Sequence, residues 1–160
     1  MNTSFQLGNG RRVRVGDWKG EKRVDIREWN GEIPTKKGIC LTLMRWRSFL
    51  DYIDQVDEAL QNNKTYSLDL GGNVYCNVKE DSPCVDIRQF WKPRDDVIPT
   101  KKGLCLRPRE YQRLKDILPE VNVAIPELSS VVPCMLQSDH ANALGFLKCS
   151  ECNPNDYANW

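Results

Sequence analysis

The chain has 160 residues, of which 40% are hydrophobic and 28% are charged, and its formal net charge is +1. This composition is typical of one or two small globular domains, and the near-neutral charge by itself favours no class of partner. No apolar run is long enough for a signal peptide or a membrane span, so we expect no membrane partner. The odd number of cysteines, seven, favours a reducing intracellular compartment.

The first forty residues predict an antiparallel sheet. Residues 5–18 are expected to form one strand, because valines alternate there with arginines. Residues 22–29 should form a second strand, which ends at the turn signal Asn30-Gly31. Residues 1–41 also carry nine Lys or Arg against five Asp or Glu. We therefore expect one apolar face and one basic, aromatic face.

A turn, a short strand and a helix are expected next. Residues 34–38 are predicted to form a turn in which Gly38 is available for positive φ, and residues 39–41 a short buried strand. Thr42 should cap a helix. Its apolar residues alternate in steps of three and four, the spacing of two helices that pack together: Trp46, Phe49, Ile53, Val56 and Leu60.

Most of this pattern occurs twice. Residues 24–27 and 34–41 return at 85–88 and 99–106, with an insertion in the second copy between Arg88 and Pro99. Upstream, we match Leu7, Gly10, Val13 and Val15 to Leu68, Gly71, Val74 and Cys76. The predicted domains are a first repeat over residues 1–62, a second repeat over 63–125 and an appended segment over 126–160.

The second repeat should end in a helix that pairs with the first one. Pro108 fits the first turn of this helix, whereas Pro119 is expected to end it early. A repeat of about sixty residues has only a marginal core of its own. The two helices are therefore predicted to pack together and to form a pseudo-symmetric dimer within one chain.

Several motifs together are specific enough to indicate a family. They are Phe5-Gln6-Leu7-Gly8, Val13-Arg14-Val15, Asp17-Trp18-Lys19-Gly20, Val24-Asp25-Ile26-Arg27-Glu28-Trp29 and Pro34-Thr35-Lys36-Lys37-Gly38-Ile39. In combination they resemble the C-terminal domain of the positive cofactor four family. Its members are RNA polymerase II transcriptional coactivators that bind single-stranded DNA. The resemblance covers nearly all of both repeats and none of residues 126–160.

The resemblance implies an α+β fold and a nuclear, nonenzymatic protein. Each repeat should be a curved four-stranded antiparallel sheet followed by one helix. Family members pair through their helices as homodimers, so the present chain looks like such a dimer fused into one polypeptide. We expect it to be a monomeric pseudodimer whose sheets line channels for single strands.

The resemblance also implies a set of residues that contact single-stranded DNA. Trp18 and Trp91 correspond to base-stacking aromatics, although the second repeat has Lys79 in place of Trp18 and the first has Asn30 in place of Trp91. Flat rings for bases and spread cations for phosphates are what a single strand requires. The complete predicted set is Arg11, Arg14, Trp18, Lys19, Arg27, Trp29, Lys36, Lys37, Arg88, Trp91, Lys101 and Lys102.

Each of these signals also has a purely structural interpretation. The tryptophans could fill a core, and the paired lysines could lie in a solvated turn. Asp25 and Asp86 are expected to form cross-strand ion pairs that orient Arg27 and Arg88. Two further repeat residues, Cys40 and Cys105, are expected to be small buried hydrophobes.

The appended segment contains a candidate zinc site. Cys134, His140, Cys149 and Cys152 could supply four tetrahedral ligands, although the first pair lacks the usual spacing. Free thiols are the alternative, so no cofactor is certain and one structural zinc is possible. Catalytic motifs such as a phosphate-binding loop or a nucleophile elbow are absent from the sequence.

The sequence therefore predicts a nonenzymatic, largely sequence-independent single-stranded DNA-binding protein of transcription, replication or repair. RNA and melted duplex are related ligands that the sequence does not separate from DNA. Transcription or replication proteins are the expected protein partners. The alternative is a coactivator-type protein-interaction module of transcription that binds nucleic acid weakly or not at all.

Overall fold

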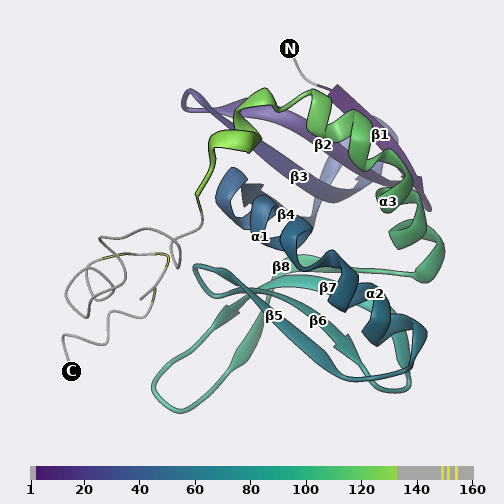
Figure 1. Cartoon of the computed structure of the whole chain (residues 1–160), viewed down its shortest axis with the longest axis vertical. Helices are drawn as coiled ribbons and strands as arrows, with labels where there is room; N and C mark the ends of the chain where they lie inside the picture. Colours follow the sequence, from purple (N-terminus) through teal and green to yellow (C-terminus); the bar gives the residue numbers. More distant parts are fainter. Residues whose placement is uncertain (1–2, 133–148, 150, 152–153, 155–160) are drawn as a thin grey trace.

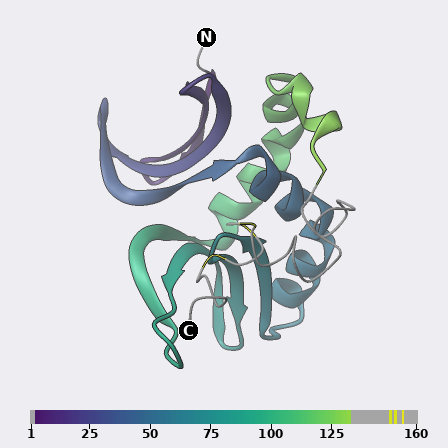
Figure 2. The same cartoon turned by 90° about the vertical axis from the view of Figure 1, so that its left-hand side faces the viewer.

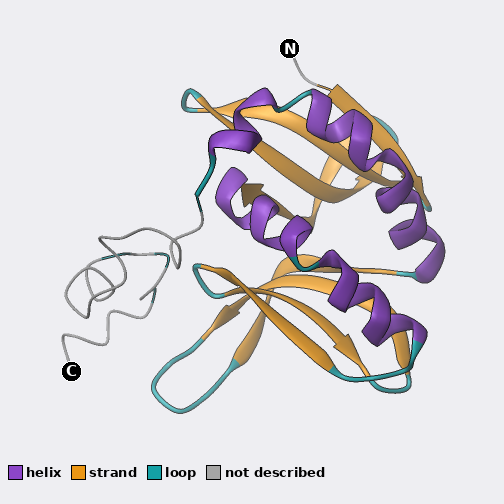
Figure 3. Ribbon diagram, viewed as in Figure 1, coloured by secondary structure: helices purple, strands orange, loops and turns teal. Residues whose placement is uncertain are grey.

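The computed structural model describes residues 3–132, 149, 151 and 154. The described chain contains two four-stranded antiparallel sheets with strand orders β1-β2-β3-β4 and β5-β6-β7-β8, each followed by helix (Figures 1 and 3). The predicted α+β fold with two repeats is confirmed. The strands are β1 Thr3–Gly8, β2 Arg11–Trp18, β3 Glu21–Asn30, β4 Ile33–Thr42, β5 Tyr66–Gly71, β6 Val74–Lys79, β7 Ser82–Trp91 and β8 Ile98–Leu106.

The helices differ from the prediction in two places. The expected single helix of the first repeat is α1 (Leu43–Asp51) and α2 (Ile53–Gln61), because Tyr52 leaves helical geometry with φ −116° and ψ 16°. Thr42 caps α1 as predicted and accepts a hydrogen bond from the Arg45 backbone at 3.3 Å. In the second repeat, α3 (Pro108–Val123) continues through Pro119. The expectation that Pro119 ends the helix is wrong; the turn beyond it places Val121 in the core, fully buried.

Helices of each repeat pack against the sheet of the other. The α3 helix lies mainly on β1 of the first sheet and also contacts β7 and β8 of its own sheet. The α2 helix lies on β5, β6 and β7 of the second sheet, whereas α1 contacts β5 of the second sheet as well as β3 and β4 of its own. β4 of the first sheet and β8 of the second lie side by side where the two sheets meet (Figure 2). The buried apolar residues of both halves consequently form one core cluster. A 3-10 helix, η1 (Pro126–Ser130), follows α3 and adds Leu128 to that cluster.

Side-chain hydrogen bonds join the helices of the two repeats, in agreement with the predicted helix contact. Asp57 of α2 accepts from the Tyr111 hydroxyl at 2.5 Å and from Lys115 Nζ at 3.1 Å. Trp46 of α1 donates to the Asn122 side chain at 3.3 Å. Burial and the hydrogen bond to Asp57 raise the pKa of Tyr111, so its hydroxyl stays protonated and donates.

One predicted strand and one predicted turn are wrong. Residues 5–18 are not one strand, because Asn9 and Gly10 take positive φ of 55° and 77° and join β1 to β2. Residues 34–38 are not a turn but the start of β4. Gly38 has no positive φ there. Its lack of a side chain is required because an added Cβ would lie 2.7 Å from Arg27 Cβ.

The register of the strands corrects the matching of the two repeats. Val13 pairs with Ile26, and the residue that pairs with the equivalent Ile87 is Cys76, not the expected Val74. Arg12 therefore corresponds to Tyr75. A shift of two residues keeps every side chain on the same face of a strand, so the alternating pattern could not reveal it.

The same correction applies to the first turn of each repeat. Gly8 with φ 101° corresponds to Gly71 with φ 103°, whereas the sequence matched Gly71 to Gly10. The Trp29 backbone N–H donates to Gly10 O at 2.7 Å, as Phe90 N–H does to Asn73 O at 2.8 Å. The β6–β7 hairpin of the second repeat is two residues shorter than the β2–β3 hairpin of the first. Its register shifts between Asn77 and Lys79, and beyond this point the repeats again match as the sequence suggested.

Candidate nucleic-acid interface

The repeated Asp-Ile-Arg segment holds an arginine against the polar face of each sheet. Arg27 donates from Nη2 to Asp25 at 3.0 Å and from Nη1 to Thr35 O at 2.9 Å. The Thr35 hydroxyl in turn donates to Glu28 O at 2.7 Å, where the pairing of β3 and β4 is irregular. Gly38 leaves room for the arginine stem. The segment thus fixes Arg27 in one position.

The second sheet repeats this arrangement. Arg88 donates to Asp86 at 3.0 Å and to Thr100 O at 2.8 Å, and the Thr100 hydroxyl donates to Gln89 O at 2.6 Å. Each Asp–Arg pair lies within one strand, at positions i and i+2, so the expected cross-strand pairing is wrong although the arginines are oriented. The lysines that follow each threonine remain exposed: Lys36, Lys37, Lys101 and Lys102.

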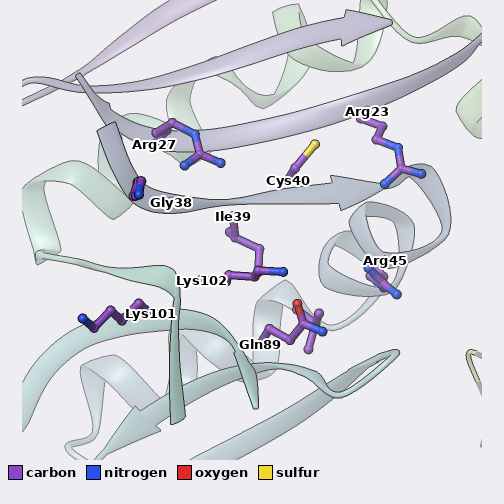
Figure 4. A pocket seen from close by; sticks show the side chains of 11 residues that line it. Arg23, Arg27, Gly38, Ile39, Cys40, Arg45, Gln89, Lys101 and Lys102 are labelled. Atoms are coloured by element: carbon purple, nitrogen blue, oxygen red, sulfur yellow. The ribbon is translucent and has the colours of Figure 1, made fainter. Parts of the chain in front are cut away.

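A cleft of about 530 Å³ lies between the polar side of the first sheet and the edge of the second (Figure 4). Both repeats contribute cations to it, and no carboxylate belongs to its described lining. Figure 4 shows Arg23, Arg27 and Cys40 above β4, with Gln89 and Lys102 facing from the second sheet. The cationic lining residues are Arg23, Arg27, Lys36, Arg45, Lys101 and Lys102.

The two candidate stacking residues lie on the surface. Trp18 is 52% exposed and Trp91 is 60% exposed, so neither fills the core. Lys19 Nζ and Arg23 Cζ each lie 4.5 Å from the Trp18 ring centroid. The only predicted aromatic that is covered is Trp29, over which Arg12 lies at 4.8 Å.

A second hollow, of about 630 Å³, contains Trp91. Gln89 and Lys102 line both this hollow and the cleft, so the two are neighbours. Behind them, Tyr75 and Phe90 pack edge to face with ring centroids 5.6 Å apart, and Lys92 Nζ lies 4.4 Å from the Tyr75 ring.

Sequence reasoning missed several residues of this surface. Arg23 and Arg45 are outside the repeated motifs that carried the prediction. Tyr75 was hidden by the two-residue error in matching, because it occupies the position of Arg12. With the correct register, the sequence would have shown that Tyr75 and Phe90 replace Arg12 and Trp29. The missed residues include Arg23, Arg45, Tyr75, Gln89, Phe90, Lys92 and Arg94.

Arg11 is not part of the cleft. Its guanidinium forms an ion pair of 2.8 Å with Glu110 at the start of α3 and donates to the Cys105 carbonyl. The two side chains are only 16% and 1% exposed, so Arg11 joins the repeats instead of facing solvent. Arg14 lies opposite Asp25 on the polar face of the first sheet. Lys19 and Lys37 are exposed outside the two hollows.

The cysteines of the repeats are not arranged as expected. Cys40 is exposed on β4, and Cys105 forms a disulfide with Cys84, so neither is a buried free thiol. The buried one is Cys76, whose pKa is raised by its burial. Desolvation and the nearby Asp25 raise the pKa of Cys40 as well.

The candidate zinc ligands cannot be compared with the fold. Cys134, His140 and Cys152 lie outside the described residues, and only Cys149 lies within them. Among the described residues no three His, Cys, Asp or Glu side chains are grouped to hold a metal ion. The described helices include none that is both long and apolar enough to cross a membrane.

Comparisons with known proteins give the family. The family model described as Transcriptional Coactivator p15 (PC4) matches residues 5–52 and 68–117. An RNA polymerase II transcriptional coactivator of Drosophila melanogaster is 42% identical over 64 residues, which are 38% of this chain and 58% of that protein. A putative RNA polymerase II transcriptional coactivator of Caenorhabditis elegans is 33% identical over 63 residues, 36% of this chain and 51% of the relative.

A plant relative shows the same extent of similarity. The RNA polymerase II transcriptional coactivator KIWI of Arabidopsis thaliana is 33% identical over 60 residues, 35% of this chain and 56% of that protein. The chain thus spans about half the length of these curated relatives. No solved structure matches it significantly. Because the family model matches both sheet-and-helix units, over more than half of the chain, the protein belongs to the family of Transcriptional Coactivator p15 (PC4) and carries two copies of its domain.

Proposed function

We propose that the chain binds single-stranded DNA, largely without sequence preference, along the cationic cleft and the exposed tryptophans. The observation that carries this proposal is the cleft itself, where six cations and no carboxylate line the described surface. A strand that brings phosphates into the cleft releases its condensed counterions, which favours binding at low salt.

Contributions from both repeats support one shared site. Lys36 is on β4 and Lys101 and Lys102 are on β8, and these two strands lie side by side. Arg27 is already held by Asp25 and by Thr35 O, so little ordering is needed before it meets a phosphate. The cleft is therefore preorganised for an extended anion.

The exposed rings favour single strands over duplex. Unstacked bases can lie on aromatic side chains, and this contact tolerates any sequence because every base has a π-face. Trp18 offers such a ring in the first repeat and Trp91 in the second. In a duplex the bases are already stacked, so these rings would find no partner.

The relatives indicate the biological setting. Their names place them with RNA polymerase II as transcriptional coactivators, which favours transcription over replication or repair for this chain. We accordingly place it in the nucleus, as a nonenzymatic partner of DNA and of transcription proteins. Because its two units already cover each other, it should act as a monomer in sedimentation experiments.

Fluorescence anisotropy of labelled oligo-dT, compared with a duplex of equal length across a salt series, tests the proposal. We expect at least about tenfold tighter binding of the single strand, with affinity that falls steeply as salt rises. The double variant Lys36→Ala/Lys101→Ala should bind more weakly and lower the salt slope by about 1.4, since each phosphate contact contributes about 0.7. Labelled oligo-rU in the same assay separates RNA from DNA.

Lys64→Ala is the matched control, because Lys64 is exposed, lies outside the cleft and, among the described residues, forms an ion pair only with Glu58, at 3.9 Å. This variant should bind like the unmodified protein. No preference for the single strand, or no binding at low salt, would contradict the proposal. The surface would then serve as a protein-interaction module of transcription with weak or no nucleic-acid binding.

A further inference from the structure

Glu151 lies beside Arg45 at the edge of the cationic cleft. Glu151 binds Arg45 through two hydrogen bonds, of 3.1 Å to Nε and 2.5 Å to Nη2. Its backbone carbonyl accepts from Gly72 N–H at 3.2 Å. Arg45 is one of the six cations that line the cleft. Glu151 therefore neutralises a residue that a phosphate would otherwise contact.

Pro154 lies at the second hollow. Pro154 lies in the lining of the hollow that contains Trp91, Lys92 and Arg94. Glu151 thus reaches the cleft only through its ion pair with Arg45, and Pro154 borders the second hollow.

In the pseudo-symmetric fold, the ion pair of Arg45 with Glu151 lies where the other half has the ion pair of Glu110 with Arg11. Glu110 at the start of α3 accepts from Asn9 and Arg11 in the first turn of the other repeat. Arg45 holds the equivalent position on α1, but Gly72 and Val74 stand in place of Asn9 and Arg11, and neither supplies a carboxylate. Glu151 supplies it from the far end of the chain.

The facing turn is shaped to receive this pair. A side chain at Gly71 would place its Cβ 2.6 Å from the Glu151 carboxylate, and one at Gly72 would collide with the Arg45 guanidinium. Both glycines also take positive φ, of 103° and 61°. The two glycines form a socket in which Arg45 can bind an oxyanion.

We propose that Glu151 is an intramolecular competitor of the nucleic acid. This inference rests on the proposed function, since it concerns the regulation of the same site. The Glu151 carboxylate takes the place of a phosphate on Arg45, which binds either anion in a bidentate manner. A bound strand displaces the Glu151 carboxylate from Arg45, and the free protein binds more weakly by the fraction of molecules in which Glu151 holds Arg45.

Glu151→Gln tests the competition in the full chain. Oligo-dT anisotropy should show about three- to tenfold tighter binding than for the unmodified protein at low salt. Glu127→Gln is the matched control, because it removes the same charge from an ion pair with Lys22 that lies outside the cleft. Thermal unfolding of both variants shows whether either change disturbs the fold.

The outcomes separate the two proposals. Equal or weaker binding by Glu151→Gln overturns the competitor, whereas the proposed function stands if both proteins bind oligo-dT. Tighter binding by Glu127→Gln to the same extent would also overturn it, because charge alone would then be the cause. If neither protein binds oligo-dT, the proposed function and the competitor fail together.

Discussion

The two repeats share a scaffold and differ on the surface that it presents. Both hold an arginine with an aspartate, a threonine carbonyl and a bare glycine. Where the first repeat places Arg12 over Trp29, the second packs Tyr75 against Phe90. Where the first repeat has Arg23 beside Cys40, the second has the Cys84–Cys105 disulfide. The comparison teaches that the repeated Asp, Arg, Thr and Gly residues fix the shape of each sheet. The residues between them differ and set the chemistry of its surface.

The largest expected difference concerns the disulfide, which only the second repeat has. Cys84 and Cys105 close a loop with a sequence separation of 21. Loss of this cross-link by Cys84→Ser should lower the free energy of unfolding by about 3 kcal/mol, because the unfolded chain regains loop entropy. Urea unfolding without reductant measures the change.

Cys40→Ser is the control for the disulfide, because Cys40 on β4 corresponds to Cys105 on β8 and forms no disulfide. It should change stability by much less. Equal unfolding midpoints for Cys84→Ser and the unmodified protein would show that the cross-link adds nothing. Urea unfolding with reductant measures the stability of the protein without the disulfide. The reducing compartment itself remains a prediction.

The shared scaffold predicts equal effects in the two repeats. Gly38→Ala and Gly103→Ala should each lower the free energy of unfolding by about 2 kcal/mol, because the added Cβ meets Arg27 Cβ at 2.7 Å or Ile87 O at 2.6 Å. Gly20→Asn is the control, since its Cβ meets nothing within 4 Å and asparagine tolerates positive φ. A large difference in unfolding free energy between the two alanine variants would show that the two repeats do not depend equally on this glycine.

The smallest expected effects are those of the tryptophans on binding. Trp18→Ala and Trp91→Ala should each weaken binding of oligo-dT about fivefold, near the lower end of what one stacked base contributes. The loss at Trp18 should be the smaller one, because Lys19 and Arg23 already lie against its ring. Trp→Phe at each site keeps a ring and should restore most of the affinity. Unchanged affinity in both alanine variants, with an intact fold, would refute the stacking role.

Much of the fold could be predicted because its signals are local. Alternating valines marked the faces of β2 and β3, and Thr42 marked the start of α1. The recurrence of Asp-Ile-Arg and Thr-Lys-Lys-Gly showed that one unit occurs twice. These patterns depend on neighbours within one strand or one turn, so the sequence displays them directly.

The rest depends on contacts between residues distant in sequence. Nothing near Cys84 indicates that it meets Cys105, and nothing near Arg11 indicates that Glu110 binds it. The exchange of helices between the sheets is likewise a property of the assembled core. The cleft was predicted through Arg27 and its repeated lysines, whereas Arg23 and Arg45 were missed because they come from segments that differ between the copies.

The exchange of helices determines what the short link between the repeats does. Since α2 covers the second sheet, α3 lies mainly on the first and α1 contacts both, a nick between Gln61 and Tyr66 would leave two fragments that still complete each other's cores. The link keeps them at an effective concentration of about millimolar, as short flexible linkers do. The link thus makes assembly of the two halves independent of protein concentration. A single chain stays assembled at concentrations where two separate halves would dissociate.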